Sequence, residues 1–289
     1  MEKAILRERL MEFLREDLGM GDVTTEAIVP AEAMASAHII AKEPMVVAGL
    51  YEASVIFEAI GVDFRAKVRD GEKVDAGTVL AEVYGRARDI LSAERTVLNI
   101  LMRMSGIATQ TRRLVETVRR AGFNVRIAAT RKTAPGLRLL DKRAVVIGGG
   151  DPHRFRLDDA VLIKDNHVRV AGGVREAIRR ARSAASFSKK IEVEVQSLEE
   201  ALESAECGVD ILMLDNMSVE EAKRTIKALE DRGLREKVII EVSGRIDEKN
   251  ILEYAKLGPD VISVGALTHS VRAADISLEV VKVSGRRLS

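Results

Sequence analysis

The amino-acid sequence predicts an α/β protein with a small N-terminal domain and a larger domain built on parallel strands. Beyond Gly122, short runs rich in β-branched residues alternate with helical stretches, which is the order that parallel sheets and barrels require. Before that point, runs of strand character are separated by turns rich in Gly and Asp. The last two predicted strands end in Gly-containing turns, and this feature favours a barrel over a doubly wound sheet.

The N-terminal part is predicted to combine helices with short strands. A first helix covers Ile5–Leu18, because apolar residues recur there at helical spacing until Gly19 ends the pattern. A long helical pattern starts at Ile90, and its polar break near Ser105–Gly106 predicts a hinge between two domains. Between these helices we expect strands at Ala37–Ala41, Met45–Ala48, Phe64–Val68 and Thr78–Tyr84, and a helix at Leu50–Ile60.

The hinge places the N-terminal domain at residues 1–105 and the second domain at 106–271. Helical stretches between consecutive strands of the second domain indicate a parallel arrangement. Its seven expected strands are Val125–Ala129, Ala144–Ile147, Val161–Lys164, Ile191–Val195, Ile211–Leu214, Val238–Val242 and Val261–Val264.

Basic residues are concentrated around the first three of these strands. Parallel strands bring the residues at their carboxyl ends to one rim, where α/β enzymes build their active sites. Any one cation alone is more simply a solvated surface charge, but surface charge has no reason to recur at strand ends. The group therefore predicts an anion site, and it consists of Arg131, Lys132, Arg138, Lys142, Arg143, His153, Arg154 and Lys164.

The overall charge gives no support for nucleic acid or a membrane surface as a partner. Lys and Arg number 46 against 45 Asp and Glu, so the formal net charge is +1 and any anion site must be local. The single Cys207 excludes an intrachain disulfide, which fits a cytoplasmic protein. No apolar run approaches the roughly 18 residues that a membrane span requires.

Carboxylates are predicted to face these cations. The strand Ile191–Val195 reads Ile-Glu-Val-Glu-Val, so Glu192 and Glu194 point to one face and Val193 to the other. Asp215 follows at the end of the next strand. The arrangement suits either ion pairs with the cations or a hydrated Mg²⁺ ion that bridges to phosphates.

Two turns near the end of the chain predict a phosphate site. Ser243–Arg245 reads Ser-Gly-Arg and Ser263–Ala266 reads Ser-Val-Gly-Ala, and each precedes a helical stretch. Small residues in such turns expose backbone N–H groups, and the loops after the closing strands of a barrel commonly bind phosphate. Neither turn has the spacing of a P-loop, and Gly148–Gly150 lacks the dinucleotide-binding pattern. ATPase and NAD-dependent activities are therefore disfavoured.

Nucleophilic and metal-centred catalysis find little support. The chain has no G-x-S-x-G motif, and its four histidines, His38, His153, His167 and His269, are not at metal-ligand spacings. What remains is an electrostatic site for a substrate that carries several carboxylates or phosphates.

The chain resembles the quinolinate phosphoribosyltransferases, also called carboxylating nicotinate-nucleotide pyrophosphorylases, of NAD biosynthesis. The resemblance runs nearly end to end, and it is carried by LGMGDVTT, SAERTVLNILMRMSGIAT, TRKTAPGLRLLDKRAVVIGGG, HRFRLDDAVLIKDNHV, EVEVQSLEEA, LMLDNMS, EVSGRI, SVGALTHS and ADISLEV. It implies an N-terminal α/β sandwich, which residues 272–289 would join, and an open seven-stranded α/β barrel. It also implies a Mg²⁺-dependent transfer of phosphoribosyl from phosphoribosyl pyrophosphate (PRPP) to quinolinate, with release of pyrophosphate and CO₂.

The same resemblance implies roles for individual residues. The cations Arg131, Lys132, His153, Arg154 and Lys164 would bind the carboxylates of quinolinate and neighbouring phosphate oxygens. Glu194 and Asp215 would hold the ribose and Mg²⁺ end of PRPP, and together with Lys132 they are the expected catalytic residues. The 5′-phosphate would lie on Ser243, Gly244 and Gly265.

Arg95 is expected to act in the site of a second subunit. In the family, the arginine of this ERT-x-L-N motif reaches into the neighbouring subunit, so the working unit is expected to be a homodimer at least, and the sequence leaves open whether it is a dimer or a hexamer. The helix that carries Arg95 is predicted to lie outside the barrel, and a cation there is well placed to cross a two-fold axis.

Two other functions remain open at this point. A phosphoribosyltransferase-like paralogue associated with molybdate transport shares the TRKT-x-P-G-x-R core but lacks the lysine of the LIKDNH segment, so Lys164 argues against it. A non-catalytic phosphate-binding barrel would bind phosphorylated sugars without turnover. An assay of CO₂ release from quinolinate distinguishes these functions.

Overall fold

The computed structural model describes residues 3–284, and the chain divides into two compact units. One unit comprises the residues up to Gln110 together with the segment from Val271 onward, and the other comprises Thr111–Ser270. Helix α4 (Ala87–Arg120) carries the chain from the first unit into the second without interruption. The polar break expected at Ser105–Gly106 is therefore not a break in the helix.

Gly106 instead permits a close approach between two segments of the first unit. A Cβ atom on Gly106 would lie 2.1 Å from the carbonyl oxygen of Arg272, which is far inside van der Waals contact. Ser105, one residue earlier, is fully buried and donates its hydroxyl hydrogen to the Ala48 carbonyl. The small polar residues at this point of α4 thus serve packing, which explains why a pattern typical of a hinge occurs inside a regular helix.

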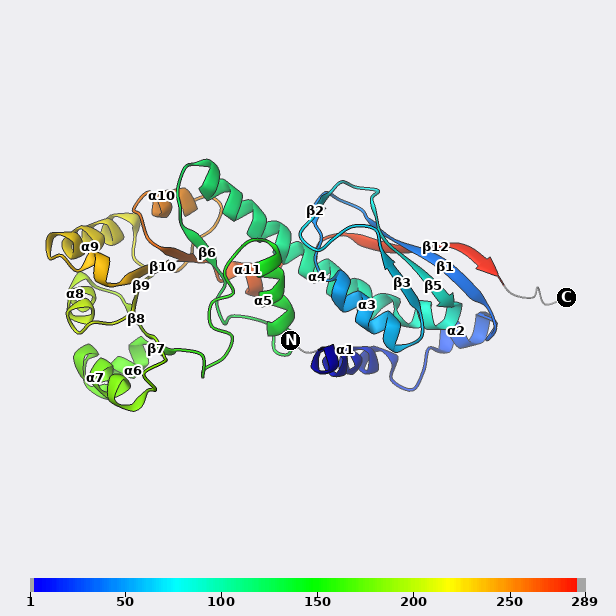
Figure 1. The fold of residues 1–289 in the computed structure, drawn as a ribbon, viewed down its shortest axis with the longest axis horizontal. Helices are drawn as coiled ribbons and strands as arrows, with labels where there is room; N and C mark the ends of the chain where they lie inside the picture. Colours follow the sequence, from blue (N-terminus) through cyan, green and yellow to red (C-terminus); the bar gives the residue numbers. More distant parts are fainter. Residues whose placement is uncertain (1–2, 285–289) are drawn as a thin grey trace. The chain divides into compact units, whose positions relative to one another are not determined.

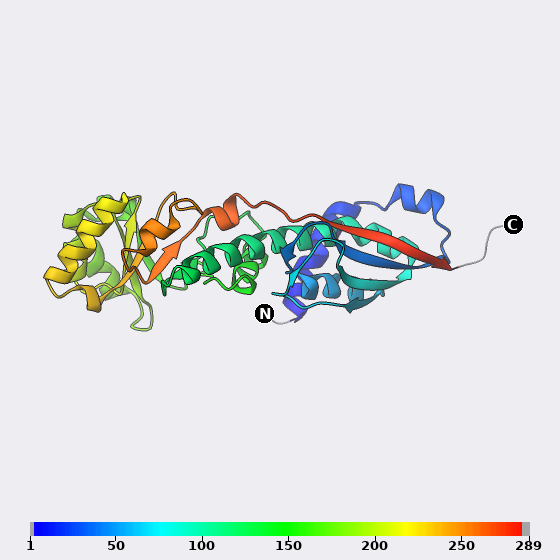
Figure 2. The same cartoon turned by 90° about the horizontal axis from the view of Figure 1, so that it is seen from above.

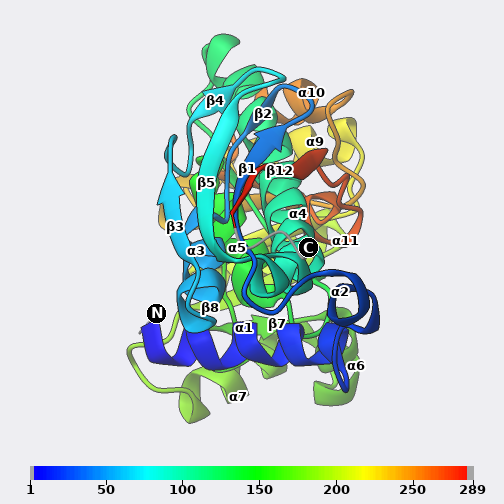
Figure 3. The ribbon, with the colours of Figure 1, turned by 90° about the vertical axis from the view of Figure 1, so that its right-hand side faces the viewer.

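The first unit is a four-stranded antiparallel sheet with helices against it, in the strand order β12-β1-β5-β3 (Figure 3). Along β1, alternate residues are buried, as expected for a sheet with one face on a core. The last described strand, β12, pairs with β1 from the far end of the sequence (Figure 2). The elements are α1 (Lys3–Leu18), α2 (Val23–Ile28), β1 (Met34–Ala41), β2 (Met45–Val46), α3 (Leu50–Ala59), β3 (Asp63–Ala66), β4 (Lys73–Val74), β5 (Val79–Arg86), the first part of α4, and β12 (Ile276–Ser284).

The second unit is a six-stranded parallel sheet in the order β6-β11-β10-β9-β8-β7. Helices α7, α8 and α9 lie against one face of its strands (Figure 1). The elements are β6 (Arg126–Ala128), α5 (Arg138–Ile147), β7 (Val161–Ile163), α6 (Asp165–Ala171), α7 (Val174–Ala184), β8 (Ile191–Val195), α8 (Leu198–Glu206), β9 (Ile211–Asp215), α9 (Val219–Asp231), the short helix η1 (Arg235–Lys237), β10 (Ile239–Ser243), α10 (Ile251–Ala255), β11 (Val261–Ser263) and α11 (Ala266–His269).

The predicted α/β architecture with an N-terminal sheet domain is confirmed, but one predicted strand is wrong. Ala144–Ile147 forms the last turn of α5. Its β-branched residues read as a strand, yet Leu140, Ala144 and Val145 are buried and Val146 is exposed, which is the burial pattern of a helix. A short apolar run cannot be assigned by composition alone when the helix that contains it begins in a polar stretch.

The seventh position in the sheet is occupied by a single bridge beside β6. Asp151 pairs in parallel with Ala128, through hydrogen bonds from Asp151 N to the Ile127 carbonyl (2.8 Å) and from Ala129 N to the Asp151 carbonyl (2.9 Å). The edges of the sheet are therefore β7 on one side and this bridge on the other. Residues 152–160 span the distance between them as an irregular loop.

The sheet buries apolar residues on its helix-covered face and polar residues on the other. Val193 and Val195 of β8 belong to the apolar core, whereas Glu192 and Glu194 on the same strand line cavities on the opposite face. The predicted alternation along this strand is thus present.

Within residues 3–284, no helix is both long enough and apolar enough to span a membrane.

Candidate functional site

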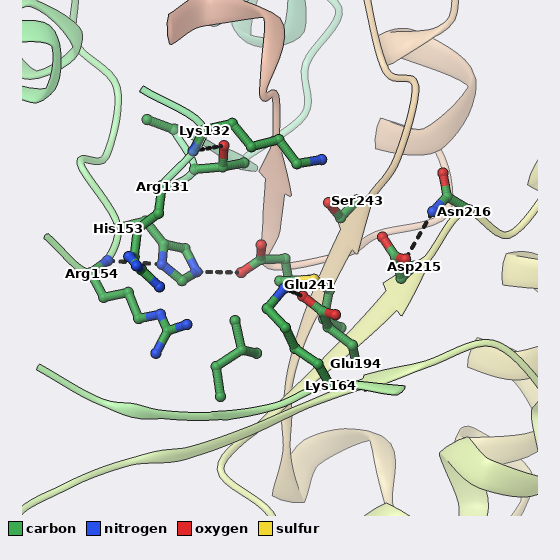
Figure 4. A pocket seen from close by; sticks show the side chains of 14 residues that line it. Arg131, Lys132, His153, Arg154, Lys164, Glu194, Asp215, Asn216, Glu241 and Ser243 are labelled. Atoms are coloured by element: carbon green, nitrogen blue, oxygen red, sulfur yellow. Dashed lines mark hydrogen bonds and ion pairs between the residues drawn. The ribbon is translucent and has the colours of Figure 1, made fainter. Parts of the chain in front are cut away.

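The predicted cations and carboxylates meet in one pocket at the carboxyl end of the parallel sheet (Figure 4). The pocket has a volume of about 310 Å³. Arg131, Lys132, His153 and Arg154 occupy one side of it, and Asp215 lies across from them. The lining residues are Ala129, Thr130, Arg131, Lys132, His153, Arg154, Leu162, Lys164, Glu194, Met213, Asp215, Asn216, Glu241 and Ser243.

Each cation of the pocket follows the carboxyl end of a strand or of the bridge. Arg131 and Lys132 lie in the loop after β6, and Lys164 follows β7 directly. His153 and Arg154 follow the bridge at Asp151. The sequence predicted this convergence. It expected a strand at Ala144–Ile147 to precede His153 and Arg154, whereas the structure has the bridge at Asp151 there.

Lys164 and Glu194, which both line the pocket, form an ion pair. The Nζ atom of Lys164 donates to Oε1 of Glu194 at 2.5 Å. The backbone N–H of Lys164 donates to Nδ1 of His167 at 2.9 Å, which caps the start of α6. His167 therefore orients the residue that carries the ammonium group rather than contacting the pocket itself.

His153 lies between two buried carboxylates. Its Nε2 atom donates to Oε2 of Glu241 at 3.1 Å and lies 3.6 Å from Oε2 of Glu192. Both glutamates are only 1% exposed, and both oxygens of Glu192 and Oε1 of Glu241 have no hydrogen-bond partner within residues 3–284. Glu192 faces a second cavity of about 350 Å³ at the amino end of the sheet, so this cluster separates that cavity from the pocket above.

The tautomer of His153 argues against a metal ion in this cluster. The backbone N–H of Arg154 donates to Nδ1 of His153 at 2.8 Å, so the ring proton of the neutral form is on Nε2. A histidine that binds a metal through Nε2 normally donates its Nδ1–H to a neighbour, which is the reverse of the arrangement here. The three residues are close enough to share an ion, but the direction of this hydrogen bond favours a proton on Nε2 instead.

The charges around His153 affect its titration and that of Glu192. Burial of the His153 ring lowers its pKa, but the interactions with Glu192 and Glu241 outweigh burial and raise that pKa above its usual value. A second ring proton would have to enter at Nδ1, where it would face the Arg154 N–H. Burial raises the pKa of the Glu192 carboxyl.

Three cations of the pocket have no carboxylate partner in the described chain. Nε of Arg131 is buried without any hydrogen-bond partner within residues 3–284. Arg154 donates from Nη1 to the Ala160 carbonyl at 3.0 Å, and Lys132 is exposed at the mouth of the pocket. An unpartnered buried guanidinium nitrogen is costly unless a ligand supplies the acceptor. These residues are therefore arranged to receive an anion.

The loop that carries His153 and Arg154 is held by a buried lysine from α5. Lys142 is 0% exposed, and its Nζ donates to the carbonyls of Pro152 and Arg154. The Phe155 ring lies 5.3 Å from Nζ. Burial, together with the positive charge of Arg138, lowers the pKa of Lys142 to about 8.

The residues predicted to bind a phosphate group occupy two neighbouring strand ends. Ser243 ends β10 and lines the pocket, and Gly244 has φ of +104°. A Cβ atom on Gly244 would lie 2.4 Å from Oδ1 of Asn216, so only glycine fits beside this side chain. Gly265 precedes α11, where a Cβ would lie 3.4 Å from Cδ of Lys132.

Two residues that line the pocket, Glu241 and Asn216, were not predicted, and one predicted site residue, Arg95, is not among the lining residues. Glu241 carried the same signal as Glu192, a glutamate inside an apolar strand, and was overlooked. Asn216 has φ of +55° and donates from Nδ2 to Oδ2 of Asp215 at 2.8 Å. Arg95 is exposed on α4, in the compact unit that does not contain the parallel sheet.

Family models and curated relatives identify one family for this chain. Residues 22–105 match the family model described as "Quinolinate phosphoribosyl transferase, N-terminal domain", and residues 107–279 match the C-terminal domain of the same family. A relative from Methanocaldococcus jannaschii, named "Probable nicotinate-nucleotide pyrophosphorylase [carboxylating]", is 51% identical over 94% of this chain and 96% of its own length. A relative from Mycobacterium leprae with the same name, without "Probable", is 43% identical over 95% of this chain.

Solved structures agree with the sequence matches. The structure of the nicotinate-nucleotide pyrophosphorylase from Francisella tularensis superposes with a TM-score of 0.88 at 38% identity, and the match covers 97% of both chains.

The depressed pKa of Lys142 predicts a pH dependence of stability. The pKa of Lys142 is about 8 in the folded protein and 10.5 in its ordinary state. Between these two pH values, the unfolded chain keeps a proton on Lys142 that the folded chain has released. The contribution of Lys142 to the free energy of unfolding therefore rises as the pH rises between these two values. Relative to Lys142→Met, the wild-type free energy of unfolding should rise by about 1–2 kcal/mol between about pH 7.5 and about pH 9.5 in urea titrations.

Arg143→Met is the matched control, because Arg143 is exposed on the same turn of α5. Its difference from the wild type should stay constant with pH. A constant difference for Lys142→Met as well would show that the pKa of Lys142 is not lowered in the folded protein.

Proposed function

The chain belongs to the quinolinate phosphoribosyl transferase family, and from that premise we propose how its residues divide between the two substrates. It is an enzyme, a pentosyltransferase of NAD biosynthesis that transfers phosphoribosyl from PRPP to quinolinate. The reaction forms a bond between the ring nitrogen of quinolinate and C1′ of the ribose while pyrophosphate leaves. The carboxylate at C2 departs as CO₂, and a proton takes its place.

Quinolinate binds against Arg131, Arg154 and Lys132. The observation that carries this assignment is the buried Nε of Arg131, which has no acceptor within residues 3–284 and lies in a pocket with two further uncompensated cations. A planar guanidinium grips a carboxylate with two parallel hydrogen bonds, and two adjacent carboxylates on one ring need more than one such donor. His153 contributes by placing Arg154, since both of its ring nitrogens already have partners.

PRPP binds across the strand ends of β8 to β11. Its 5′-phosphate lies at the turns of Ser243, Gly244 and Gly265, where the absence of large side chains leaves backbone N–H groups accessible. Its ribose lies beside Glu194 and Asp215. Lys164, already paired with Glu194, keeps that carboxylate in place and adds positive charge for the phosphate oxygens.

The carboxylates fit a Mg²⁺ ion that is bound mainly through the pyrophosphate of PRPP and water. Mg²⁺ prefers oxygen ligands and in such sites is held by one or two carboxylates plus phosphates. Asp215 is the better candidate, because its described partner is the neutral amide of Asn216, whereas Glu194 is paired with a lysine. When bound, the ion would neutralise the charge of the leaving pyrophosphate.

Catalysis by the protein is then electrostatic. As the bond from C1′ to pyrophosphate breaks, positive charge develops on the ribose ring and negative charge on the leaving group. Glu194 and Asp215 stabilise the former, and Lys132 stabilises the latter from the mouth of the pocket. Fixed charges cost no reorganisation during the reaction, and holding both substrates in line removes the entropic cost of their encounter.

The active assembly is a homodimer or a larger oligomer in the cytoplasm. Arg95 lies on α4, exposed, in the compact unit that does not contain the pocket. A cation at this place completes the cationic half of the site if it comes from a second copy of the chain.

The function is tested by following CO₂ released from labelled quinolinate in the presence of PRPP and Mg²⁺. Stoichiometric release with formation of nicotinate mononucleotide is expected. The cationic pocket is suited to a dianion, so nicotinate, which has one carboxylate, should react poorly. Equal turnover of nicotinate without CO₂ release would refute the assignment.

Replacing either guanidinium by an ammonium group should weaken quinolinate binding. Arg131→Lys and Arg154→Lys keep the charge but lose the paired hydrogen bonds, at an expected cost of about 1.5–3 kcal/mol each. Titration calorimetry with quinolinate measures this loss. Arg156→Lys is the control, because Arg156 is exposed in the same loop and does not line the pocket. Unchanged affinity in both site variants would remove these residues from the carboxylate site.

Sharing of Arg95 between subunits predicts complementation. Arg95→Ala and Lys132→Ala should each be inactive alone, because one lacks the partner's cation and the other lacks a cation of its own pocket. Mixed under conditions of subunit exchange, they should regain part of the activity, since some hybrid sites combine an intact Arg95 with an intact Lys132. Exchange is verified by native mass spectrometry, and an exchanged mixture without activity would place Arg95 outside the partner's site.

A further inference from the structure

Lys142 is a buried cation with an unusual set of partners. Its Nζ contacts the carbonyl oxygens of Pro152 and Arg154 and the ring of Phe155, and it forms no ion pair with a carboxylate within residues 3–284. It lines neither the pocket nor the cavity at the amino end of the sheet. Lys142 therefore cannot touch a substrate in that pocket, and any effect on the reaction passes through the residues it holds.

Such a cation is costly to the fold. Removing an ammonium group from water carries a desolvation penalty that hydrogen bonds to carbonyl oxygens offset only in part. The charges of Arg138 and Arg131 add repulsion, which acts in the same direction as burial. An apolar side chain of similar length would fill the same volume without this penalty, so the lysine is not explained by stability alone.

What Lys142 holds is a strained turn. His153, between the two carbonyls bound by Nζ, has φ of +53°, a left-handed conformation that is strained for a residue with a side chain. The N–H of His153 donates to Oδ1 of Asp151 (2.7 Å), and the N–H of Arg154 donates to the His153 ring (2.8 Å). The turn is thus fixed from the N–H side by local groups and from the carbonyl side by Lys142.

We propose that Lys142 is a positioning residue for quinolinate: by holding the Pro152 and Arg154 carbonyls, it keeps the turn in the conformation that points Arg154 and His153 into the pocket. This inference rests on the proposed function, because it assumes that Arg154 binds a carboxylate of quinolinate. The proposed contacts of PRPP lie at the ends of β8 to β11 and on Lys132 and Lys164, and none of them belongs to this turn.

The other contacts of the turn place this role on Lys142 specifically. Arg138, one helical turn earlier on α5, donates from Nη1 to the Phe155 carbonyl at 3.3 Å, and Oδ2 of Asp159 accepts from the N–H groups of Phe155 and Arg156. These contacts fix the end of the turn beyond Arg154. Among residues 3–284, the Pro152 and Arg154 carbonyls have only Lys142 as a hydrogen-bond donor.

The test is steady-state kinetics of Lys142→Met with each substrate varied in turn. The KM for quinolinate should rise about tenfold or more, whereas the KM for PRPP should change less than about twofold. A purely structural role would lower the amount of active enzyme and leave both KM values unchanged. Hydrogen exchange should accelerate at the amides of residues 153–156 and stay unchanged along β8 to β10.

Two comparisons make the result decisive. Lys223→Met, the same substitution at an exposed lysine of α9 that lines neither cavity, should leave both KM values at the wild-type level. A folded Lys142→Met enzyme with an unchanged KM for quinolinate overturns the proposal, while wild-type enzyme that fails to release CO₂ from quinolinate overturns the proposed function instead.

A milder variant covers the case in which Lys142→Met does not fold. Phe155→Leu removes the aromatic face against which the ammonium lies and leaves the hydrogen bonds of Lys142 intact. The KM for quinolinate should then rise about threefold with an unchanged KM for PRPP, which corresponds to the loss of one cation–π contact. Equal effects on both KM values would overturn the proposal.

Discussion

The site depends on charge pairing inside the parallel sheet. Glutamates of β8 and β10 face away from the apolar core, and a carboxylate there is tolerated only beside a cation or a hydrogen-bond donor. Glu194 forms an ion pair with Lys164, and Glu241 accepts a hydrogen bond from His153. Once these pairs are made, Arg131, Lys132 and Arg154 are left without a carboxylate within residues 3–284, and that surplus of positive charge is what a substrate with two carboxylates requires.

Backbone strain is placed at the same end of the sheet as this surplus charge. Three residues other than glycine have positive φ in the described chain, namely His153, Asn216 and Arg245. Each follows the bridge or a strand of the parallel sheet at its carboxyl end. Strain of this kind persists only where the surroundings hold it, and two of these residues, His153 and Asn216, line the pocket. Gly244, which a Cβ would drive into Asn216, is part of the same packing.

Sequence patterns predicted the parts of this structure that follow from local periodicity. Alternation along Ile191–Val195 placed Glu192 and Glu194 on one face because side chains in a strand alternate by geometry. The same pattern is present at Glu241 in β10, so the sequence carries a signal for that residue as well. Ala144–Ile147 was misassigned because β-branched composition is shared by strands and by the buried ends of helices. Burial of Lys142 and the tautomer of His153 had no local signal, since both depend on contacts between distant segments.

The sheet itself explains why a lysine is buried beneath the turn of His153. Glu194, Asp215 and Ser243 sit on strands whose backbone is hydrogen-bonded to neighbours on both sides, so their positions follow from the ladder. His153 and Arg154 follow a single bridge and lie in the loop that spans the open edge of the sheet, where no ladder exists. The backbone groups of that loop must find partners elsewhere or remain mobile. Helix α5 supplies them through Arg138 and Lys142, so the first turns of the helix that ends in Ala144–Ile147 provide the positioning that a further strand at this edge would have provided.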